Sequence, residues 1–222
     1  MSASPVALLV LGLLLGMRHA TDPDHVVAMT TIVSRQPGRR SAIALGAAWG
    51  VGHTATILLF GGAIILCGAV IPPRVGLSLE MAVAVMLILL GAFNLVGRSP
   101  IHRHEHAHAA RGIGLGRGFF VGVIHGLAGS AAVALLVLST IRNHAWALVY
   151  LAIFGAGTVL GMMTLTAAMM ASLAAVSRHS RAIDRLMTGL SGVASIAFGL
   201  FLSYRLTLVD GLFSDLPRWT PH

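Results

Sequence analysis

The stretch "GMRHATDPDHVVAM", residues 16–29, places five ionisable side chains within eight positions of an otherwise apolar segment. The five are Arg18, His19, Asp22, Asp24 and His25. A charged side chain at the centre of a membrane-spanning helix costs about 2.5–3.5 kcal/mol, so such residues usually handle ions or substrates there. The stretch therefore predicts both a break in a membrane helix and a site for an ion.

The composition around this stretch is that of a membrane protein. Of the 222 residues 56% are hydrophobic and 10% are charged, whereas a soluble domain has about 25% charged residues. The apolar runs are continuous and lack the alternation of barrel strands. We therefore expect an all-α integral membrane protein with six membrane-spanning helices. The expected spans are 5–33, 41–69, 75–97, 116–141, 145–175 and 186–206.

The first span is too long for one straight crossing. Residues 5–33 would extend about 43 Å at 1.5 Å per residue, against a hydrocarbon core of about 30 Å. Pro23 lacks the N–H that would bond the carbonyl of His19. Asp22 followed by Pro23 is typical of a helix start. We expect one half-helix to end near His19 and another to start at Pro23.

The basic residues indicate the orientation of the chain. All of them are arginines, and ten lie in the connections after the first, third and fifth spans, against four on the opposite side. Because cytoplasmic loops are enriched in basic residues, both termini are expected outside a bacterial inner (plasma) membrane. The net charge of +8 then reflects mostly the arginines of the cytoplasmic loops. No basic face for binding nucleic acid is indicated.

The two halves of the chain resemble one another. His125 aligns with His19 at an offset of 106, Phe154 with Trp49 at 105, and Phe198 with Leu90 at 108. Each half has three spans, so the second half must be inverted relative to the first, as in many secondary transporters. The expected organisation is a first repeat, a His-rich cytoplasmic loop, a second repeat and a short tail. Their bounds are 1–97, 98–115, 116–206 and 207–222.

Several polar side chains are candidates for a metal site. A break at Pro23 would let Asp24 and His25 converge with His19, and His53 and His125 lie at comparable depth in later spans. Imidazole and carboxylate ligands without a thiolate suit divalent nickel, cobalt or zinc. The expected metal-handling residues are His19, Asp22, Asp24, His25, His53 and His125.

Alternatives remain for these residues. A buried histidine in a span is often a packing residue, and Arg18 with the two aspartates could simply form an ion network between helices. Two histidines and two aspartates so close together favour a metal site, in which the positive charge of Arg18 balances the negative charge of one carboxylate. Further residues are expected beside the ligands, although one of them, Asn94, could instead link helices. These neighbours are Arg18, Thr54, Asn94 and Ser130.

The connection between the two halves contains "IHRHEHAHAAR", with four alternating histidines. They are His102, His104, His106 and His108. A His-rich tract is typical of loose, exchangeable metal binding, so we expect an auxiliary metal-binding loop. A polar linker without function is the alternative.

Two motifs resemble those of the nickel/cobalt transporter (NiCoT) family. "RHATDPDH" is similar to the family's signature in an early membrane helix, and "VGHTATI" around His53 is similar to its second motif. "HGLAGSA" and "FGAGTVLGMM" resemble the shorter six-span branch of UreH-type urease accessory permeases. The resemblance implies that His19, Asp22, Asp24, His25 and His53 handle the metal. The chain departs from the family at Pro23, where Ala is common, and lacks the later acidic motifs of the eight-span members.

We therefore expect a permease, not an enzyme, that has no cofactor and moves nickel(II), or cobalt(II), into the cell. Its partners would be the ion, the bilayer and a cytoplasmic nickel acceptor or urease maturation proteins. Export uses the same residues and stays open. An intramembrane zinc hydrolase with Ser130 as a nearby hydroxyl is a further alternative, although none of the expected membrane helices contains an "HExxH" pattern.

Overall fold

The computed structural model describes residues 5–68, 71–96, 109–127, 141, 143–177 and 181–219. All regular secondary structure among these residues is helical. The helices after the first apolar run are α3 (Arg39–Cys67), α4 (Pro73–Val96), α5 (Ala109–Leu127), α7 (His144–Ser177) and α8 (Arg181–Tyr204), and α8 continues into the π-helical turn η2 (Arg205–Val209).

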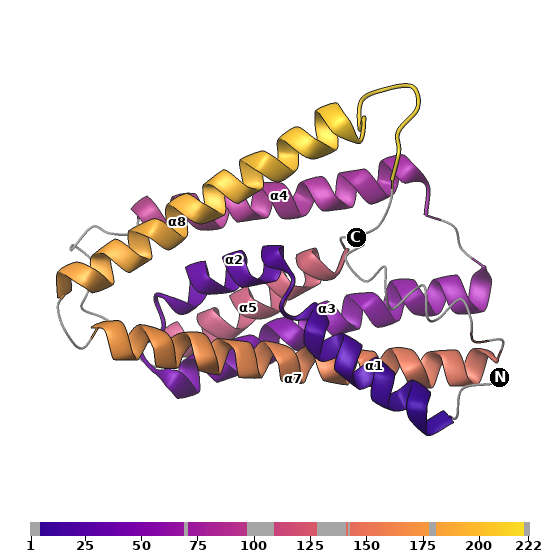
Figure 1. Ribbon diagram of the computed structural model, residues 1–222, viewed down its shortest axis with the longest axis horizontal. Helices are drawn as coiled ribbons and strands as arrows, with labels where there is room; N and C mark the ends of the chain where they lie inside the picture. The colour runs from indigo at the N-terminus through magenta and orange to yellow at the C-terminus, as the bar shows by residue number, and fades with distance from the viewer. Residues whose placement is uncertain are drawn as a thin grey trace.

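The first apolar run forms two helices, α1 (Pro5–His19) and α2 (Pro23–Val33), which meet at an angle of 56° (Figure 1). Pro23 lies in the first turn of α2, where its missing N–H costs no hydrogen bond. Asp22 before it has an extended backbone, with φ −60° and ψ 145°. The predicted break between His19 and Pro23 is confirmed.

Four described helices are long and apolar enough to cross a membrane: α3, α4, α7, and α8 with η2; the bent pair of α1 and α2 makes a fifth crossing if it counts as one span. The chain is therefore a multi-pass membrane protein. The expected fourth span, 116–141, coincides with α5 only as far as Leu127, and most of its remainder lies outside the described residues. The count of six spans stays a prediction.

The helices pack in two groups with α2 between them (Figure 1). α3 packs against both α5 and α7, and α1 packs against α7. α4 pairs with α8 to form the other group, and the short helix α2 touches α4, α7 and α8. The end of α1 and the start of α2 thus reach the middle of the molecule, where the polar residues of the opening stretch meet residues of α3 and α5.

Glycines allow two of these helix pairs to approach closely. A Cβ atom on Gly16 of α1 would lie 2.0 Å from the carbonyl oxygen of Phe154, and one on Gly122 of α5 would lie 2.1 Å from that of Trp49. No side chain fits at such a distance. The two contacts correspond to each other under the offsets of 106 and 105 found in the sequence.

A second pair of matched contacts joins α4 to α8. A Cβ atom on Gly91 would lie 2.5 Å from the carbonyl oxygen of Gly192, and one on Gly199 would lie 2.7 Å from that of Ala84. These contacts correspond under the offset of 108. Such pairs are what two repeats related by a two-fold axis would produce, and the inverted repeat itself stays a prediction.

Candidate metal centre

His19 ends α1 and is held from two sides. Its Nδ1 atom lies 2.8 Å from Oδ2 of Asp22, and its Nε2 atom lies 2.9 Å from Nε2 of His53 on α3. Asp22 occupies the N-cap position of α2, yet its side chain makes no capping bond because the carboxylate is turned to His19. An ionised carboxylate only accepts hydrogen bonds, so neutral His19 donates from Nδ1 and keeps a lone pair on Nε2.

His25 and His125 are joined through Asp24. Nδ1 of His25 lies 3.2 Å from Oδ1 of Asp24, and Nε2 of His125 on α5 lies 2.9 Å from Oδ2 of the same carboxylate. By the same reasoning, neutral His25 donates from Nδ1 and keeps the lone pair on Nε2. That Nε2 atom is buried and has no hydrogen-bond partner among the described residues.

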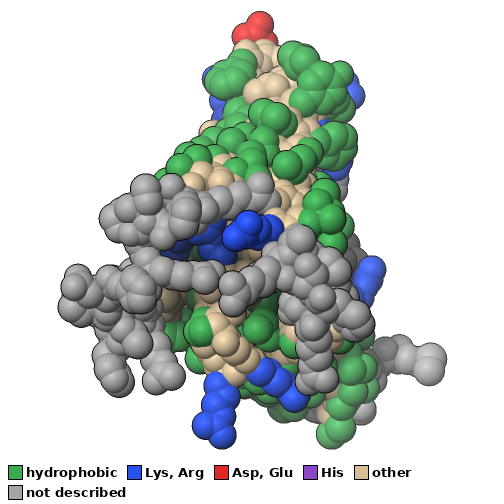
Figure 2. Space-filling model, turned by 90° about the vertical axis from the view of Figure 1, so that its left-hand side faces the viewer, with side chains coloured by type: hydrophobic (Ala, Val, Ile, Leu, Met, Phe, Trp, Pro, Cys, Tyr) green, Lys and Arg blue, Asp and Glu red, His purple; other side chains and the backbone are tan. Residues whose placement is uncertain are grey.

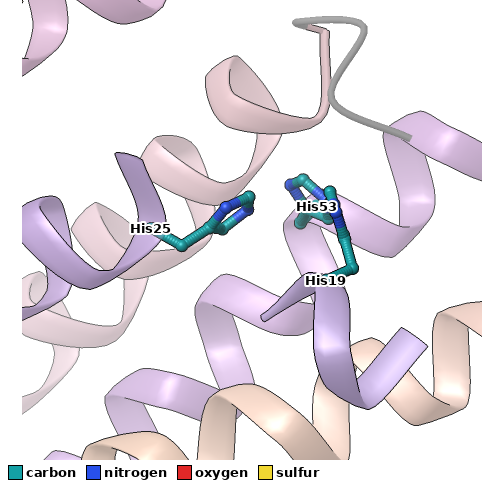
Figure 3. Close-up of side chains that lie close together, drawn as sticks. All are labelled: His19, His25 and His53. Carbon is teal, nitrogen blue, oxygen red and sulfur yellow. The ribbon is translucent and has the colours of Figure 1, made fainter. Parts of the chain in front are cut away.

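The imidazoles form one cluster at the helix break. The ring centroid of His25 lies 4.8 Å from that of His19, 5.0 Å from that of His53 and 4.5 Å from that of His125. His25 points from α2 toward the rings of His19 and His53 (Figure 3). The broken segment and two further helices, α3 and α5, therefore bring their histidines together.

Two overlapping sets of ligand atoms result. His19, His25 and His53 form one set, and Asp24, His25 and His125 form the other. Within each set the ligand atoms lie within 4.8 Å of one another. His25 is the residue common to both sets.

The cluster is buried deeply enough for unpaired polar atoms to matter. His25, His53 and His125 are 0% exposed. Nδ1 of His53 and Nδ1 of His125, like Nε2 of His25, lack a partner in the described part of the chain. Buried polar atoms are nearly always hydrogen-bonded, and an unpaired one costs about 1–3 kcal/mol. Unpaired imidazole nitrogens within one buried cluster fit a divalent ion such as nickel, cobalt or zinc.

Arg18 lies apart from this cluster. Its side chain is exposed, and it forms no ion pair with a carboxylate in the described residues. Adjacent positions on a helix point about 100° apart, so burying His19 turns Arg18 outward. Arg18 therefore does not balance the charge of an aspartate, contrary to expectation. The carboxylates of both aspartates pair with histidines instead.

Thr54 and Asn94 serve helix packing. Thr54 donates from Oγ1 to the carbonyl oxygen of Gly155, which joins α3 to α7. Asn94 donates to Thr188 on α8 and accepts a hydrogen bond from Nε of Arg35. Asn94 therefore links helices, and it also lines a cavity at the end of α2.

Five expected residues cannot be placed. Ser130 and the four histidines of the tract, His102, His104, His106 and His108, lie outside the described residues.

The sequence interpretation missed Trp49. Its indole is fully buried and faces two ligand candidates, with ring centroids 6.3 Å from His25 and 5.4 Å from His125. The signal was present in the sequence, since Trp49 precedes His53 by four residues and so shares its helix face.

The chain is similar to three known proteins. It is 36% identical to the urease accessory protein UreH of Bacillus sp. strain TB-90 over 218 residues, covering 94% of this chain and 95% of that protein. It is 28% identical to a Methanocaldococcus jannaschii protein named as a nickel/cobalt efflux system, over 85% of this chain and 88% of that protein.

The third relative is a chloroplast protein for growth and fertility from Arabidopsis thaliana. It is 26% identical over 211 residues, which cover 85% of this chain and 56% of that protein. No family model matches the chain, and no solved structure matches it.

Proposed function

The chain belongs to the UreH family of urease accessory proteins, and from that premise we propose that it is a permease for divalent transition-metal ions. Nickel(II) is the first substrate proposed and cobalt(II) the second. The observation that supports this most is the buried meeting of four imidazoles, His19, His25, His53 and His125, at a break in a membrane helix. The name of the Methanocaldococcus relative points to the same metals.

The ion binds between the Nε2 atoms of the first ligand set. Nε2 of His19 and Nε2 of His53 face each other at 2.9 Å, so an ion that binds both requires the proton on Nε2 of His53 to move to Nδ1 of the same ring, which has no partner among the described residues. Nε2 of His25 is the third donor. Asp22 and Asp24 hold His19 and His25 in the tautomer that presents Nε2, as carboxylates commonly do for metal-bound histidines. His125 forms a hydrogen bond with Asp24, and these two residues make up the second ligand set together with His25.

Two inverted three-helix repeats move around this site to open it to either side in turn. The matched contacts of Gly16 with Phe154 and of Gly122 with Trp49 support this arrangement. So does the pairing of helices, because exchanging the repeats turns the contact of α1 with α7 into that of α5 with α3. Discontinuous helices at a repeat interface are typical of ion sites in secondary transporters.

Uptake into the cytoplasm of a bacterium is the direction that we propose, with both termini outside the plasma membrane. A membrane potential supplies about 2.3 kcal/mol per charge per 100 mV, which drives a divalent cation inward without further coupling. A cytoplasmic nickel acceptor or a urease maturation protein would receive the ion. The opposite direction has one observation in its favour, the efflux named for the Methanocaldococcus relative.

Nickel flux into proteoliposomes of known orientation tests the function and its direction. We expect saturable accumulation that His19→Ala abolishes. His144→Ala is the matched control, because His144 is exposed at the start of α7 and lies outside the cluster. Accumulation only through inversely oriented protein would establish export. Absence of flux in both orientations, from protein that remains folded, would contradict transport.

A further inference from the structure

We propose that Trp49 and Phe154 are the two gates of the ion path. Trp49 closes the histidine cluster toward an arginine-lined cavity, and Phe154 closes it on the opposite side. This inference rests on the proposed transport function, and it assigns to two apolar residues a role in the path itself.

A cavity of ≈ 330 Å³ lies where α2 ends and where α3 and α5 begin. Its lining includes Ile32, Leu45, Leu90, Arg35 and Arg117. Both arginines are exposed, so the cavity reaches the surface. Arginine side chains gather on this end of the molecule (Figure 2).

Three helices connect this cavity to the histidines in the same way. On each of them a cluster histidine is followed, one helical turn away, by a buried apolar residue and, one further turn away, by a cavity-lining residue. In that order the sets are His53, Trp49 and Leu45 on α3; His125, Val121 and Arg117 on α5; His25, Met29 and Ile32 on α2. Residues three or four apart share a helix face, and four residues span about 6 Å.

The middle layer is a continuous apolar barrier. Trp49 and Met29 are 0% exposed and Val121 is 4% exposed, and all three belong to one hydrophobic cluster. Trp49 is the largest of them, and its ring faces His25 and His125. An ion leaving the histidines toward the cavity therefore has to displace the Trp49 indole.

A corresponding layer closes the other side of the cluster. Phe154 of α7 packs with Leu15 and Ile57, and its ring centroid lies 5.5 Å from that of His19. Leu15 and Ile57 are each four residues from a cluster histidine, but in the direction away from the cavity. Phe154 also corresponds to Trp49 under the offset of 105, so each repeat supplies one aromatic gate.

The charges in the cavity suit a passage and not a second binding site. Arg35 donates to the carbonyl oxygens of Phe93 and Asn94 at the end of α4. The guanidinium of Arg117 lies 5.8 Å from the ring centroid of Phe93. Two guanidiniums near the path repel a divalent cation, so an ion that passes Trp49 does not stay in the cavity.

Cysteine reactivity tests the gates without metal, so its outcome is independent of the transport assay. The native Cys67 is replaced by Ala in full-length protein in lipid nanodiscs, and single cysteines are introduced at Ile32 in the cavity, Val121 in the Trp49 layer and Ile57 in the Phe154 layer. With a small charged methanethiosulfonate, Ile32→Cys should react at least tenfold faster than Val121→Cys. Adding Trp49→Ala should raise the rate at Val121→Cys at least tenfold and leave Ile57→Cys unchanged, whereas Trp49→Phe should leave both protected.

Three outcomes would overturn the proposal. Val121→Cys could react as fast as Ile32→Cys while Trp49 is present, which would mean that there is no barrier. Trp49→Ala could leave Val121→Cys protected, or it could expose Ile57→Cys equally, which would indicate general loosening. If Trp49→Ala fails to fold, Met29→Ala replaces it in the same comparison, and Phe154→Ala, which should expose Ile57→Cys but not Val121→Cys, tests the second gate.

Discussion

His25 connects the polar network of the opening stretch to the rest of the molecule. Its Nδ1 is bound to Asp24, its Nε2 has no partner in the described part of the chain, and its ring contacts those of His19, His53 and His125. The proline beside it makes this possible, because α2 starts at Pro23 and can turn His25 inward at an angle that a continuous helix would not allow.

The carboxylate of Asp22 should tune the site without binding the ion itself. Asp22→Asn replaces the charged acceptor at Nδ1 of His19 with a neutral amide, so the affinity for nickel should fall by about 10–100-fold while the protein stays folded. Equilibrium binding of nickel to the purified protein measures this loss. Asp215→Asn, at an exposed carboxylate of the C-terminal tail, is the matched control and should bind as the wild type does. Unchanged affinity for nickel in Asp22→Asn would show that Asp22 has no part in metal binding.

The residues of the cluster could be predicted from the sequence because charge in an apolar segment is conspicuous. The side chain that each of these residues contacts could not be predicted in this way. The sequence suggested that Arg18 would balance an aspartate, but helix geometry sends Arg18 outward beside the buried His19. Trp49 was overlooked because a tryptophan in an apolar run looks like ordinary packing, and only its place against His25 and His125 distinguishes it.

At the scale of the elements, the histidines are positioned by helices that nearly touch. α5 meets α3 at Gly122, where a Cβ atom would lie 2.1 Å from the carbonyl oxygen of Trp49. His125 and Val121, which packs in the Trp49 layer, both lie within one turn of this contact. The distance between the two helices therefore sets the distance from His125 to the rest of the cluster.

Adding one methyl group at this contact should separate the helices. Gly122→Ala should destabilise the protein by about 1–3 kcal/mol, as overpacking typically does. Gly116→Ala in the same helix has no atom within 4 Å of the added group and should be neutral or stabilise by about 0.5–1 kcal/mol. Thermal unfolding of the purified protein compares them. Equal stability of the two variants would show that the close approach is unimportant.

The broken first helix was predictable since its cause is local: Pro23 and the length of the apolar run suffice. The contact that the Asp22 side chain makes was less predictable. Its position predicts an N-cap, and the structure puts it at the N-cap, but its carboxylate binds His19 and leaves the helix end uncapped. A partner three residues back in the preceding helix becomes available only once the chain has bent.

At the scale of the whole molecule, the two halves make matched contacts, with α4 against α8 and α3 against α7 at their common boundary. Sequence offsets alone suggested this relation weakly, because Gly-rich apolar segments align easily. The direction in which each helix crosses the membrane depends on whether α5 and the residues after it cross completely.

Labelling from one side of the membrane determines this topology. In protein with Cys67→Ala, Pro37→Cys lies between the first and second spans and Ala145→Cys lies at the start of α7. Both positions are exposed. Three crossings separate them in the six-span arrangement, so an impermeant maleimide should reach Pro37→Cys only from the cytoplasm and Ala145→Cys only from outside. Labelling of both from the same side would contradict the inverted repeat.

The central claim is that buried imidazoles hold the transported ion, and the nickel X-ray absorption spectrum of the loaded protein tests it most directly. Wild-type protein and the control His144→Ala should both show the multiple scattering of several imidazole ligands around one nickel ion per chain. His25→Ala, which removes the ligand common to both sets, should lose the bound nickel or this scattering. A His25→Ala protein that retains one nickel ion with an unchanged spectrum would contradict the account.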